Sequence, residues 1–527
     1  MKQIRVLDCT LRDGGYINDF NFGKGVIDDI ICGLSKASID IIECGFLKSN
    51  ANDLDKSLFS SIENISEHII EKADNSMYVA MIQYGAISID EISDYDGKSI
   101  DGIRLTFHEH EIEPAFVLGK QLLNKGYKVF MQPVGTTSYE DSALIDLIKK
   151  VNKLKPYAFY MVDTLGKMYK NDLLRMFYIV DHNLDQRIAL GFHSHNNLQM
   201  SFANAQELAQ VDTTRNIIID ASILGMGRGA GNLNTELLVQ YLNVNQGLKY
   251  DVFEIMTLMD QYIKPLSTKY KWGYDAAYYL AAVTDCHPNY ASYLLNKQTL
   301  QIRDIGTILN GLDIGKRTLF NKSFIDNEYA KYMNRFVDDS EVCDALKKII
   351  GEKRVLLLAP GKSLGSESAR INNLLFDNDC FTVSVNFIPK DIDVDLVFIS
   401  NMKRFHNVKD LPTNKGIKAV VTSNIENPGN GFWIVNYASY LNEENCIIDN
   451  AGIMCINLLK KIGVKDFLLA GFDGFSDNIK DNFFEESLYL DAENERTVMV
   501  NLAMSDKVEQ LRKQVKIEFF APSSYDK

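Results

Sequence analysis

The sequence has few prolines and no pairing pattern among its cysteines. Only 10 prolines and eight cysteines occur in 527 residues, and no two cysteines form a C-x-x-C pair. In a large chain without a secretion signal, such cysteines indicate reduced thiols, which argues against a disulfide framework or a zinc finger. Hydrophobic residues make up 46% and charged residues 24%, so long disordered tracts are excluded as well.

Long apolar runs and a basic stripe are also missing. The longest apolar stretches, such as Val355–Ala359, fall far short of the ~20 residues that a membrane helix needs. The start, MKQIRVLDCT, lacks the apolar run of a signal peptide. The formal net charge is −14 and is spread along the chain, which argues against nucleic acid or anionic membrane as the main partner. We therefore expect a cytoplasmic protein without a membrane span.

One strand–helix unit repeats through the first half of the chain. Short apolar, β-branched runs begin 25 to 37 residues apart, and each interval contains a helix-like segment such as SALIDLIKKVNKL. Continuous apolar strands with room for a crossover helix indicate parallel strands that are buried on both faces. The eight runs begin at Ile4, Asp40, Met77, Gly102, Tyr127, Ala158, Ala189 and Ile217.

Eight such units within about 245 residues favour a closed (β/α)8 barrel. An open doubly wound sheet is the alternative, because one sequence does not reveal strand order. Residues 246 to about 335 indicate helices packed on the barrel, and apolar runs alternate again after Lys353. We predict an α/β protein with a barrel over 1–300, a helical extension and linker over 301–345, and a smaller Rossmann-like domain over 346–527.

Polar residues collect where the barrel strands end, which is the face that carries function in this architecture. The first strand ends in LDCTLRDGGY with Arg12 and Asp13, the sixth in Asp163, and the seventh in His193 and His195. Residues i and i+2 of a strand point to the same side, so both histidines can reach one ion. Barrel closure brings Asp13 beside them. Two imidazoles and a carboxylate suit Mn, Fe, Co, Zn or Mg ions; the alternative is a solvated strand end.

Four motifs carry a resemblance to a known family. LDCTLRDGGY, VDTLG, GFHSHNNLQMSFANA and GMGRGAGNLNTELL together resemble the metal-dependent aldolase/lyase superfamily of 4-hydroxy-2-oxovalerate aldolases, 3-hydroxy-3-methylglutaryl-CoA lyases and isopropylmalate synthases. The resemblance covers about residues 1–300, and the hydroxy-oxovalerate aldolases are the most similar subgroup.

The resemblance implies a role for each strand-end residue. It makes Asp13, His193 and His195 ligands of a divalent metal, with Mn²⁺ expected first and Mg²⁺, Co²⁺ or Zn²⁺ as alternatives. Arg12 would steady an enolate oxygen, and Thr164 would lie near the oxo-acid end of the substrate. Asn232 would be either a further ligand or a cap of the next helix.

The identity of the proton acceptor is open. The family places a histidine three residues after the metal-binding aspartate, and this chain has Tyr16 there. With an ordinary pKa near 10, Tyr16 needs help to act as a base, so it either accepts the proton or positions substrate. For Tyr274 there are two expected roles: it covers the active site, or it packs against a helix. His108, in a second H-x-H motif, contacts substrate or lies in a solvated loop, and His287 is expected to pack.

The C-terminal domain opens with a strand, the turn APGKSLG and a helix. Such a turn binds phosphate through backbone amides, which suggests Gly361 and Ser363, although the full P-loop pattern is absent. With SVNFIPKDIDVDLVFISN, which contains Asn386, the domain resembles bacterial CMP-sialic-acid-dependent sialyltransferases over about residues 353–475. The resemblance implies a site for a CMP-type nucleotide or nucleotide sugar. Because no histidine follows His406, the family's late catalytic histidine has no counterpart.

The motifs thus predict a metal-dependent class II aldolase that acts on a 2-oxo acid and an aldehyde, in a homo-oligomer. The fused domain suggests a role in sugar-acid metabolism for a surface polysaccharide. The alternatives are an acyl-CoA Claisen-type synthase or lyase, a bifunctional enzyme with a C-terminal glycosyltransferase, and a barrel whose second domain senses nucleotide.

Overall fold

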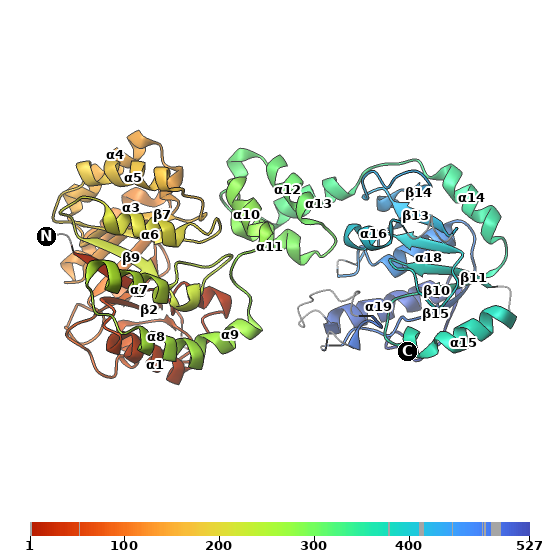
Figure 1. Ribbon diagram of the computed structural model, residues 1–527, viewed down its shortest axis with the longest axis horizontal. Helices are drawn as coiled ribbons and strands as arrows, with labels where there is room; N and C mark the ends of the chain where they lie inside the picture. The colour runs from red at the N-terminus through yellow and green to blue at the C-terminus, as the bar shows by residue number, and fades with distance from the viewer. Residues whose placement is uncertain are drawn as a thin grey trace. The chain divides into compact units, whose positions relative to one another are not determined.

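The computed structural model describes residues 3–51, 53–377, 380–410, 416–444, 446–476, 478, 481–485 and 497–526. The chain divides into two compact units, Met1–Ser292 and Tyr293–Lys527. Each unit has a parallel β-sheet of its own with helices around it (Figure 1). Among the described residues, no helix has both the length and the apolar character that crossing a membrane requires.

Eight parallel strands close the barrel of the first unit. The first strand, β1 (Ile4–Asp8), pairs with both the last, β9 (Ile217–Ala221), and the second, β2 (Ile41–Leu47), so no edge of the ring is open. A short ninth strand, β3 (Leu58–Phe59), pairs with β2 outside the ring. The predicted closed barrel is confirmed. The other strands are β4 (Met77–Gln83), β5 (Gly102–Phe107), β6 (Lys128–Pro133), β7 (Ala158–Asp163) and β8 (Ala189–Ser194).

Amphipathic helices cover the outside of this ring. In α4 (Asp141–Leu154), for example, the buried residues Leu144, Leu147, Ile148 and Val151 recur at helical spacing and face the core. The other helices of the strand–helix units are α1 (Lys24–Lys36), α2 (Ile62–Ser66), α3 (Ile112–Asn124), α5 (Lys170–Asn183), α6 (Ser201–Gln210) and α7 (Thr235–Gln246). After them come α8 (Val252–Leu258), α9 (Lys264–Lys269), α10 (Ala276–Val283) and α11 (Pro288–Asn296).

The second unit contains a seven-stranded sheet in the order β14-β13-β12-β11-β10-β15-β16, with every pair parallel. Five of its strands match the apolar runs of the sequence: β10 (Arg354–Leu358), β11 (Cys380–Val385), β12 (Leu396–Ile399), β13 (Lys418–Thr422) and β15 (Asp466–Ala470). Two short edge strands, β14 (Phe432–Val435) and β16 (Lys516–Phe519), were not predicted. The separate α/β domain is thereby confirmed.

The helices of this unit include part of the predicted linker. Asp339, just before α14 (Ser340–Ile350), is buried and accepts hydrogen bonds from the Asn436 amide and the Tyr440 hydroxyl. The first helices of the unit are α12 (Ile302–Gly311) and α13 (Lys322–Met333). The others are α15 (Ser363–Asp377), α16 (Met402–Val408), α18 (Ala451–Lys461) and α19 (Thr497–Arg512). The division of function at 300 and 345 stays a prediction.

Candidate active site

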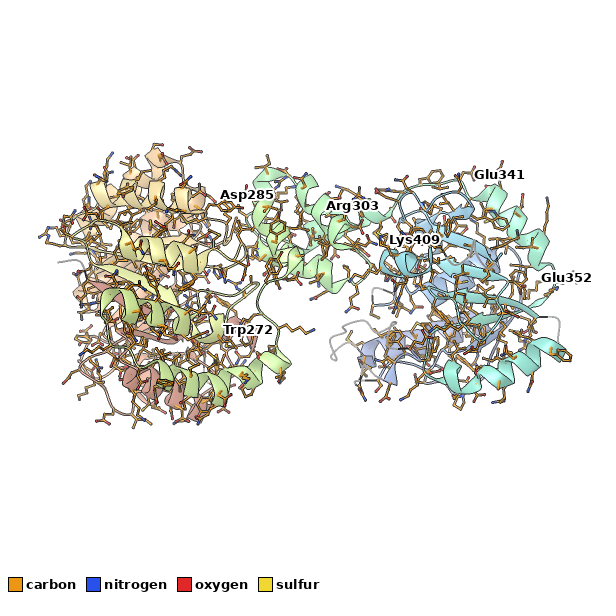
Figure 2. All side chains as sticks on the ribbon, viewed as in Figure 1. Trp272, Asp285, Arg303, Glu341, Glu352 and Lys409 are labelled. Carbon is orange, nitrogen blue, oxygen red and sulfur yellow. The ribbon has the colours of Figure 1, made fainter. Side chains whose placement is uncertain are left out.

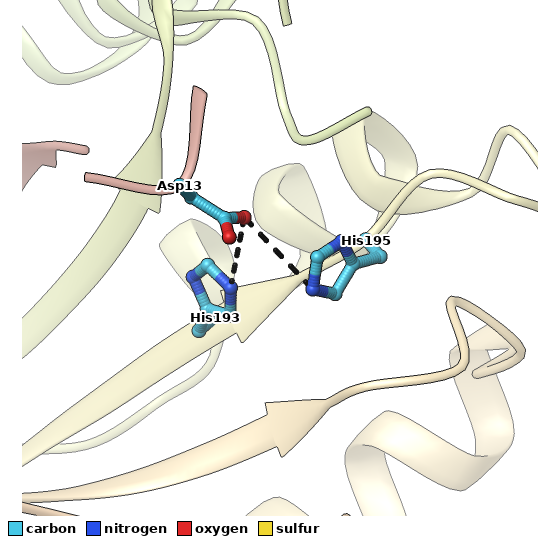
Figure 3. Close-up of side chains that lie close together, drawn as sticks. All are labelled: Asp13, His193 and His195. Carbon is cyan, nitrogen blue, oxygen red and sulfur yellow. Dashed lines mark ion pairs between the residues drawn. The ribbon is translucent and has the colours of Figure 1, made fainter. Parts of the chain in front are cut away.

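Asp13, His193 and His195 meet at the carboxyl ends of β1 and β8 (Figure 3). One candidate ligand atom from each lies within 4.8 Å of the others. Asp13 Oδ2 is 3.6 Å from His193 Nε2 and 3.9 Å from His195 Nε2. The structure therefore brings together the three residues that the sequence suggested as metal ligands.

Strand pairing explains how residues so far apart in the chain meet. The backbone amides of Arg12 and Asp13 both donate to the carbonyl oxygen of Cys9, at 3.1 and 2.8 Å, so the chain turns directly after β1. Because β1 pairs with β9 and β9 pairs with β8, this turn lies next to the end of β8. His193 and His195, two residues apart, present their rings to the same side.

A carboxylate from β9 fixes the orientation of one imidazole. His193 Nδ1 lies 3.0 Å from Asp220 Oδ2 in the buried interior of the barrel. Burial would raise the pKa of Asp220, but the charge of Arg104 and the contacts with His193 together outweigh it and hold the pKa below its usual range. Asp220 is therefore the acceptor of a hydrogen bond from His193 Nδ1, and this contact turns Nε2 toward Asp13. Metal-binding histidines are commonly held by a carboxylate in this way.

The ion pairs continue from Asp220 as a chain of alternating charge. Arg104 donates to both Asp220 and Glu43, the latter at 2.6 Å. Arg12 donates through Nε to Glu43 at 2.8 Å and through Nη1 to Asp13 at 2.9 Å. All five side chains are buried. The network thus ties Arg12 and the cluster of Asp13, His193 and His195 to three different strands of the barrel wall.

The sequence analysis did not single out Glu43, Arg104 or Asp220. A signal was present, because each is the one charged residue within an apolar strand segment: IIECGF, GIRLTF and IIIDA. Charged residues are rarely fully buried unless they are paired, so isolated charges in core strands point to one another. Which of these charged side chains form ion pairs depends on the strand order and on the face of the sheet to which each side chain points.

The electrostatics of the site suit a bound cation. Burial lowers the pKa of His195 to about 3, which keeps its ring neutral and able to ligate a metal. Burial would raise the pKa of Asp13, but Arg12 and the other basic neighbours together outweigh it and keep the carboxylate ionised. Within the network three carboxylates face two guanidinium groups. The excess negative charge is what a divalent ion would compensate.

The buried polar atoms that have no hydrogen-bond partner in the described part of the chain include three at this site: Asp13 Oδ2, Asn232 Oδ1 and Arg12 Nη2. An unpaired buried carboxylate oxygen and amide oxygen are costly unless something binds them. The two acceptors fit a metal ion, and the Arg12 donor fits an oxygen of a substrate. The donor set of this chain therefore fits the metal that its motifs implied.

Asn232 lies beside His195, to which it is joined by an isolated β-bridge. Its Nδ2 donates to the Met226 carbonyl at 3.0 Å. The residue at the start of α7 is Asn234, so Asn232 does not cap that helix. Of the two roles considered for Asn232, the helix cap is wrong. The ligand role stays a prediction.

The support of His193 by Asp220 gives a testable expectation. Asp220→Asn should weaken Mn²⁺ binding by about 10- to 100-fold, the usual effect of losing a carboxylate behind a metal-binding histidine. Calorimetric titration of Mn²⁺ measures it, with a cooperative thermal transition as the check on folding. Asp181→Asn is the matched control, because Asp181 pairs with the buried Arg215 at 2.7 Å outside the cluster. Unchanged affinity in Asp220→Asn would contradict the assigned support.

Tyr16 lies in the short 3-10 turn Gly14–Ile17 that follows Asp13. Its ring packs edge-on against Phe20 and Phe46, with centroids 5.1 and 5.9 Å away. The guanidinium of Arg228 covers the ring at 4.0 Å from the centroid. Burial raises the pKa of Tyr16, and the charge of Arg228 only partly offsets it. The phenol is therefore protonated at neutral pH.

The other predicted residues occupy different positions around the barrel. Thr164, just past β7, accepts a hydrogen bond from the Gly135 amide at 2.9 Å. His108 follows β5 and is half-buried, with its ring stacked on that of His110. Tyr274, before α10, is 62% exposed. Burial lowers the pKa of His287 to about 4. The substrate roles of Thr164, His108 and Tyr274 stay predictions.

In the second unit, the predicted phosphate contacts are already engaged. The Gly361 amide donates to the Gly471 carbonyl at 3.0 Å, and the Ser363 amide donates to Asp473 Oδ2 at 2.6 Å. The carboxylate of Asp473 thus takes the position at the start of α15 that the sequence assigned to a phosphate. The two amides do not form a phosphate cradle in this structure.

A cavity of about 420 Å³ lies nearby, at the carboxyl ends of β10, β11, β12 and β15. Gly361 and Asn386 line this cavity. Asn386 Oδ1 also accepts hydrogen bonds from the Ser400 and Asn401 amides. After β14 the chain crosses to the other side of β10 and forms β15, so β10 lies between β11 and β15 in the sheet. Open α/β sheets bind ligands at such a switch point.

Comparisons with known proteins concern the barrel. The HMGL-like family model matches residues 3–261. An oxaloacetate decarboxylase of Mycobacterium tuberculosis is 28% identical over 245 residues, which are 45% of this chain and 69% of that protein. A 4-hydroxy-2-oxovalerate aldolase of Geobacillus genomosp. 3 is 28% identical over 274 residues, 50% of this chain and 77% of that protein. Among solved structures, the N-terminal domain of a candidate aldolase from Bacteroides vulgatus shares 26% identity and a TM-score of 0.48, covering 55% of this chain and 96% of that one.

Proposed function

We propose that the barrel, which the HMGL-like family model matches over residues 3–261, is a divalent-metal-dependent aldolase. It forms or cleaves a C–C bond next to a 2-oxo acid, by way of the pyruvate enolate. The observation that carries this proposal is the cluster of Asp13, His193 and His195 with Arg12 hydrogen bonded directly to its carboxylate. We expect Mn²⁺ as the metal, with Mg²⁺, Co²⁺ or Zn²⁺ as alternatives.

Residues of the chain itself supply most of the groups that this reaction needs. A divalent ion, when bound by Asp13, His193, His195 and Asn232, supplies Lewis-acid stabilisation of an enolate. Arg12 keeps one buried N–H group, Nη2, that is not used within the described residues. Glu43 and Asp13 hold the rest of the guanidinium. Arg12 is thus set to donate to an oxyanion without rearranging, which is the efficient form of such stabilisation.

Tyr16 suits proton donation better than proton acceptance, because its phenol is protonated at neutral pH. In the addition direction it would protonate the alkoxide that forms from the aldehyde. Tyr16→Phe keeps the ring between Phe20 and Phe46. It should lower the rate of aldol addition by roughly 100-fold or more, as expected for loss of a general acid, and leave pyruvate enolisation within about threefold.

Aldol addition and deuterium exchange at the pyruvate methyl group, measured on the same preparation, test the role of Tyr16. Tyr178→Phe, an exposed substitution on α5, is the control. Equal loss of both rates in Tyr16→Phe would show that Tyr16 acts on the enolate or on the fold, not on the alkoxide.

Decarboxylation of a 2-oxo dicarboxylate is a second candidate reaction. It passes through the same enolate and needs no acceptor for a hydroxyl proton, so the raised pKa of Tyr16 favours it in the cleavage direction. The matched Mycobacterium tuberculosis relative is named an oxaloacetate decarboxylase. An acyl-CoA Claisen reaction is the remaining alternative for the barrel.

One panel of assays separates these reactions. The full chain with Mn²⁺ is given a 4-hydroxy-2-oxo acid, oxaloacetate, or acetyl-CoA together with a 2-oxo acid, and the release of pyruvate, CO₂ or free CoA is measured. The aldolase proposal expects pyruvate together with an aldehyde from the first substrate. Turnover of oxaloacetate alone would favour the decarboxylase, and CoA release alone would contradict both enolate proposals.

For the second unit we propose binding of a small polar ligand in the cavity at the ends of β10, β11, β12 and β15. Its position at the switch point of the sheet supports this. A CMP-type nucleotide or nucleotide sugar is the ligand that the sequence suggested. Because Asp473 occupies the start of α15, the phosphate would need other contacts than the amides of Gly361 and Ser363. Calorimetry of the full chain with CMP, CDP and UDP-sugars tests it, and no heat with any of them would contradict the nucleotide assignment.

A further inference from the structure

We propose that Arg228 selects the second substrate of the barrel, and that this substrate is an aldehyde with a carboxylate or phosphate group distant from its reacting carbon. The inference rests on the proposed aldolase function. It concerns the glycine-rich segment after β9, whose sequence is GMGRGAGN over residues 225–232.

The backbone around Arg228 is held in one conformation. Gly229 and Gly231 have φ angles of 67° and 81°, in the left-handed region, and a Cβ on Gly231 would lie 2.1 Å from the Gly225 carbonyl oxygen. The segment after α9 secures the loop from outside. Trp272 Nε1 donates to the Leu224 carbonyl at 3.0 Å, and the Gly273 amide donates to the Gly229 carbonyl at 3.2 Å (Figure 2 labels Trp272).

The side chain of Arg228 stands over Tyr16 without an acidic partner. Its guanidinium lies 4.0 Å from the centroid of the Tyr16 ring, and the residue is exposed. Across the described residues, Arg228 takes part in no recorded ion pair, although most arginines of this chain do. A cation on an aromatic face keeps its charge and its N–H donors at the rim, available to an anion.

Arg228 shares its side of the barrel with two imidazoles. After burial, the groups that lower the pKa of His287 are Arg228 and His108, and no carboxylate counteracts them. His287 precedes α11, and His108 follows β5, so basic groups from three separate elements come near one another on this side of the barrel. The positive charge of Arg228 also lowers the pKa of Asp13 and of His195. An anionic group would meet the charge of Arg228 here, on the side of the barrel where the imidazoles of His287 and His108 lie.

The two arginines of the site differ in how deeply their side chains are buried. Arg12 is 5% exposed and is bonded directly to Asp13, whereas Arg228 is exposed on a loop beyond Tyr16. The oxo-acid enolate therefore belongs with Arg12. In the addition, C3 of the enolate bonds to the aldehyde carbon, the carbonyl π electrons move to oxygen, and the alkoxide takes a proton. The rest of the aldehyde extends away from the enolate, toward Arg228.

The test compares matched anionic and neutral aldehydes in pyruvate addition. The pairs are succinic semialdehyde against butanal for the carboxylate, and glyceraldehyde 3-phosphate against glyceraldehyde for the phosphate. We expect the parent enzyme to favour the anionic member of at least one pair by about tenfold or more in kcat/KM, as a charge-assisted hydrogen bond implies. Which pair shows it identifies the anion.

Three variants assign that preference. Arg228→Gln should bring the anionic-to-neutral ratio close to one, and Arg228→Lys should keep part of it. Arg187→Gln, which removes an exposed arginine before β8, is the matched control and should leave the ratio unchanged. Equal loss for anionic and neutral aldehydes in Arg228→Gln, or no preference in the parent, would overturn the inference. Absence of pyruvate enolisation in the parent would overturn the aldolase proposal itself, and the inference with it.

Discussion

Asp13→Asn and His195→Ala should each abolish metal binding and lower C–C bond cleavage by about a thousandfold or more. Each change removes one of the three ligand atoms that lie within 4.8 Å of one another. A metal ion contributes several kcal/mol of charge stabilisation to an enolate-forming step, and every 1.36 kcal/mol corresponds to a factor of ten in rate. Metal content by mass spectrometry and pyruvate release measure the two effects on the same preparation.

His182→Ala is the control for these variants, because His182 is an exposed histidine on α5. It should keep both metal and activity. Full activity of Asp13→Asn or His195→Ala in the presence of excess chelator would contradict the metal-dependent account.

Arg12→Lys should fold, bind metal and lose at least roughly a hundredfold in turnover. Lysine keeps the charge but is a single ammonium group, whereas Arg12 donates to Glu43 and Asp13 and still has Nη2 for a substrate oxygen. Loss of one oxyanion donor costs about 3–4 kcal/mol. Steady-state kinetics and metal content are the measurements.

The pattern of loss distinguishes a catalytic Arg12 from a structural one. A lower kcat with unchanged metal affinity and unchanged melting temperature is the expected result. Turnover within about threefold of the parent would show that the charge alone suffices. Loss of metal together with loss of stability would assign Arg12 to the ion-pair network only.

The sequence was sufficient to predict the barrel and the clustering of Asp13, His193 and His195, because both follow from simple patterns. Each strand is a continuous apolar run, and the H-x-H spacing at the end of one of them already places both rings on one side. Closure of the ring then determines that Asp13, after β1, lies near them. No long-range detail beyond strand order was required.

The buried network behind the site required information that a single sequence does not contain. Glu43, Arg104 and Asp220 come from β2, β5 and β9, and their pairing follows from which strands face one another across the barrel. Arg228 was within a recognised motif, but its position over Tyr16 depends on the fold of a glycine-rich loop.

The second unit shows how a distant residue changes the meaning of a local motif. The turn APGKSLG before a helix is typical of phosphate binding, yet Asp473, 110 residues away from Ser363, supplies the anion from within the chain. The strand–turn–helix pattern was recognised correctly, but the amides of Gly361 and Ser363 already donate hydrogen bonds within the chain. The short edge strands β14 and β16 were also missed, since four apolar or mixed residues give little periodic signal.

The central claim is that the barrel generates a pyruvate enolate at a metal held by Asp13, His193 and His195. Deuterium exchange of the pyruvate methyl protons in D₂O, followed by proton NMR with the full chain, measures enolate formation without any aldehyde. The account predicts exchange by the Mn²⁺-loaded protein, its loss on chelation and in His195→Ala, and its return when Mn²⁺ is restored to the parent. Exchange that persists at the same rate without metal, or a metal-loaded protein that does not exchange pyruvate, would contradict it.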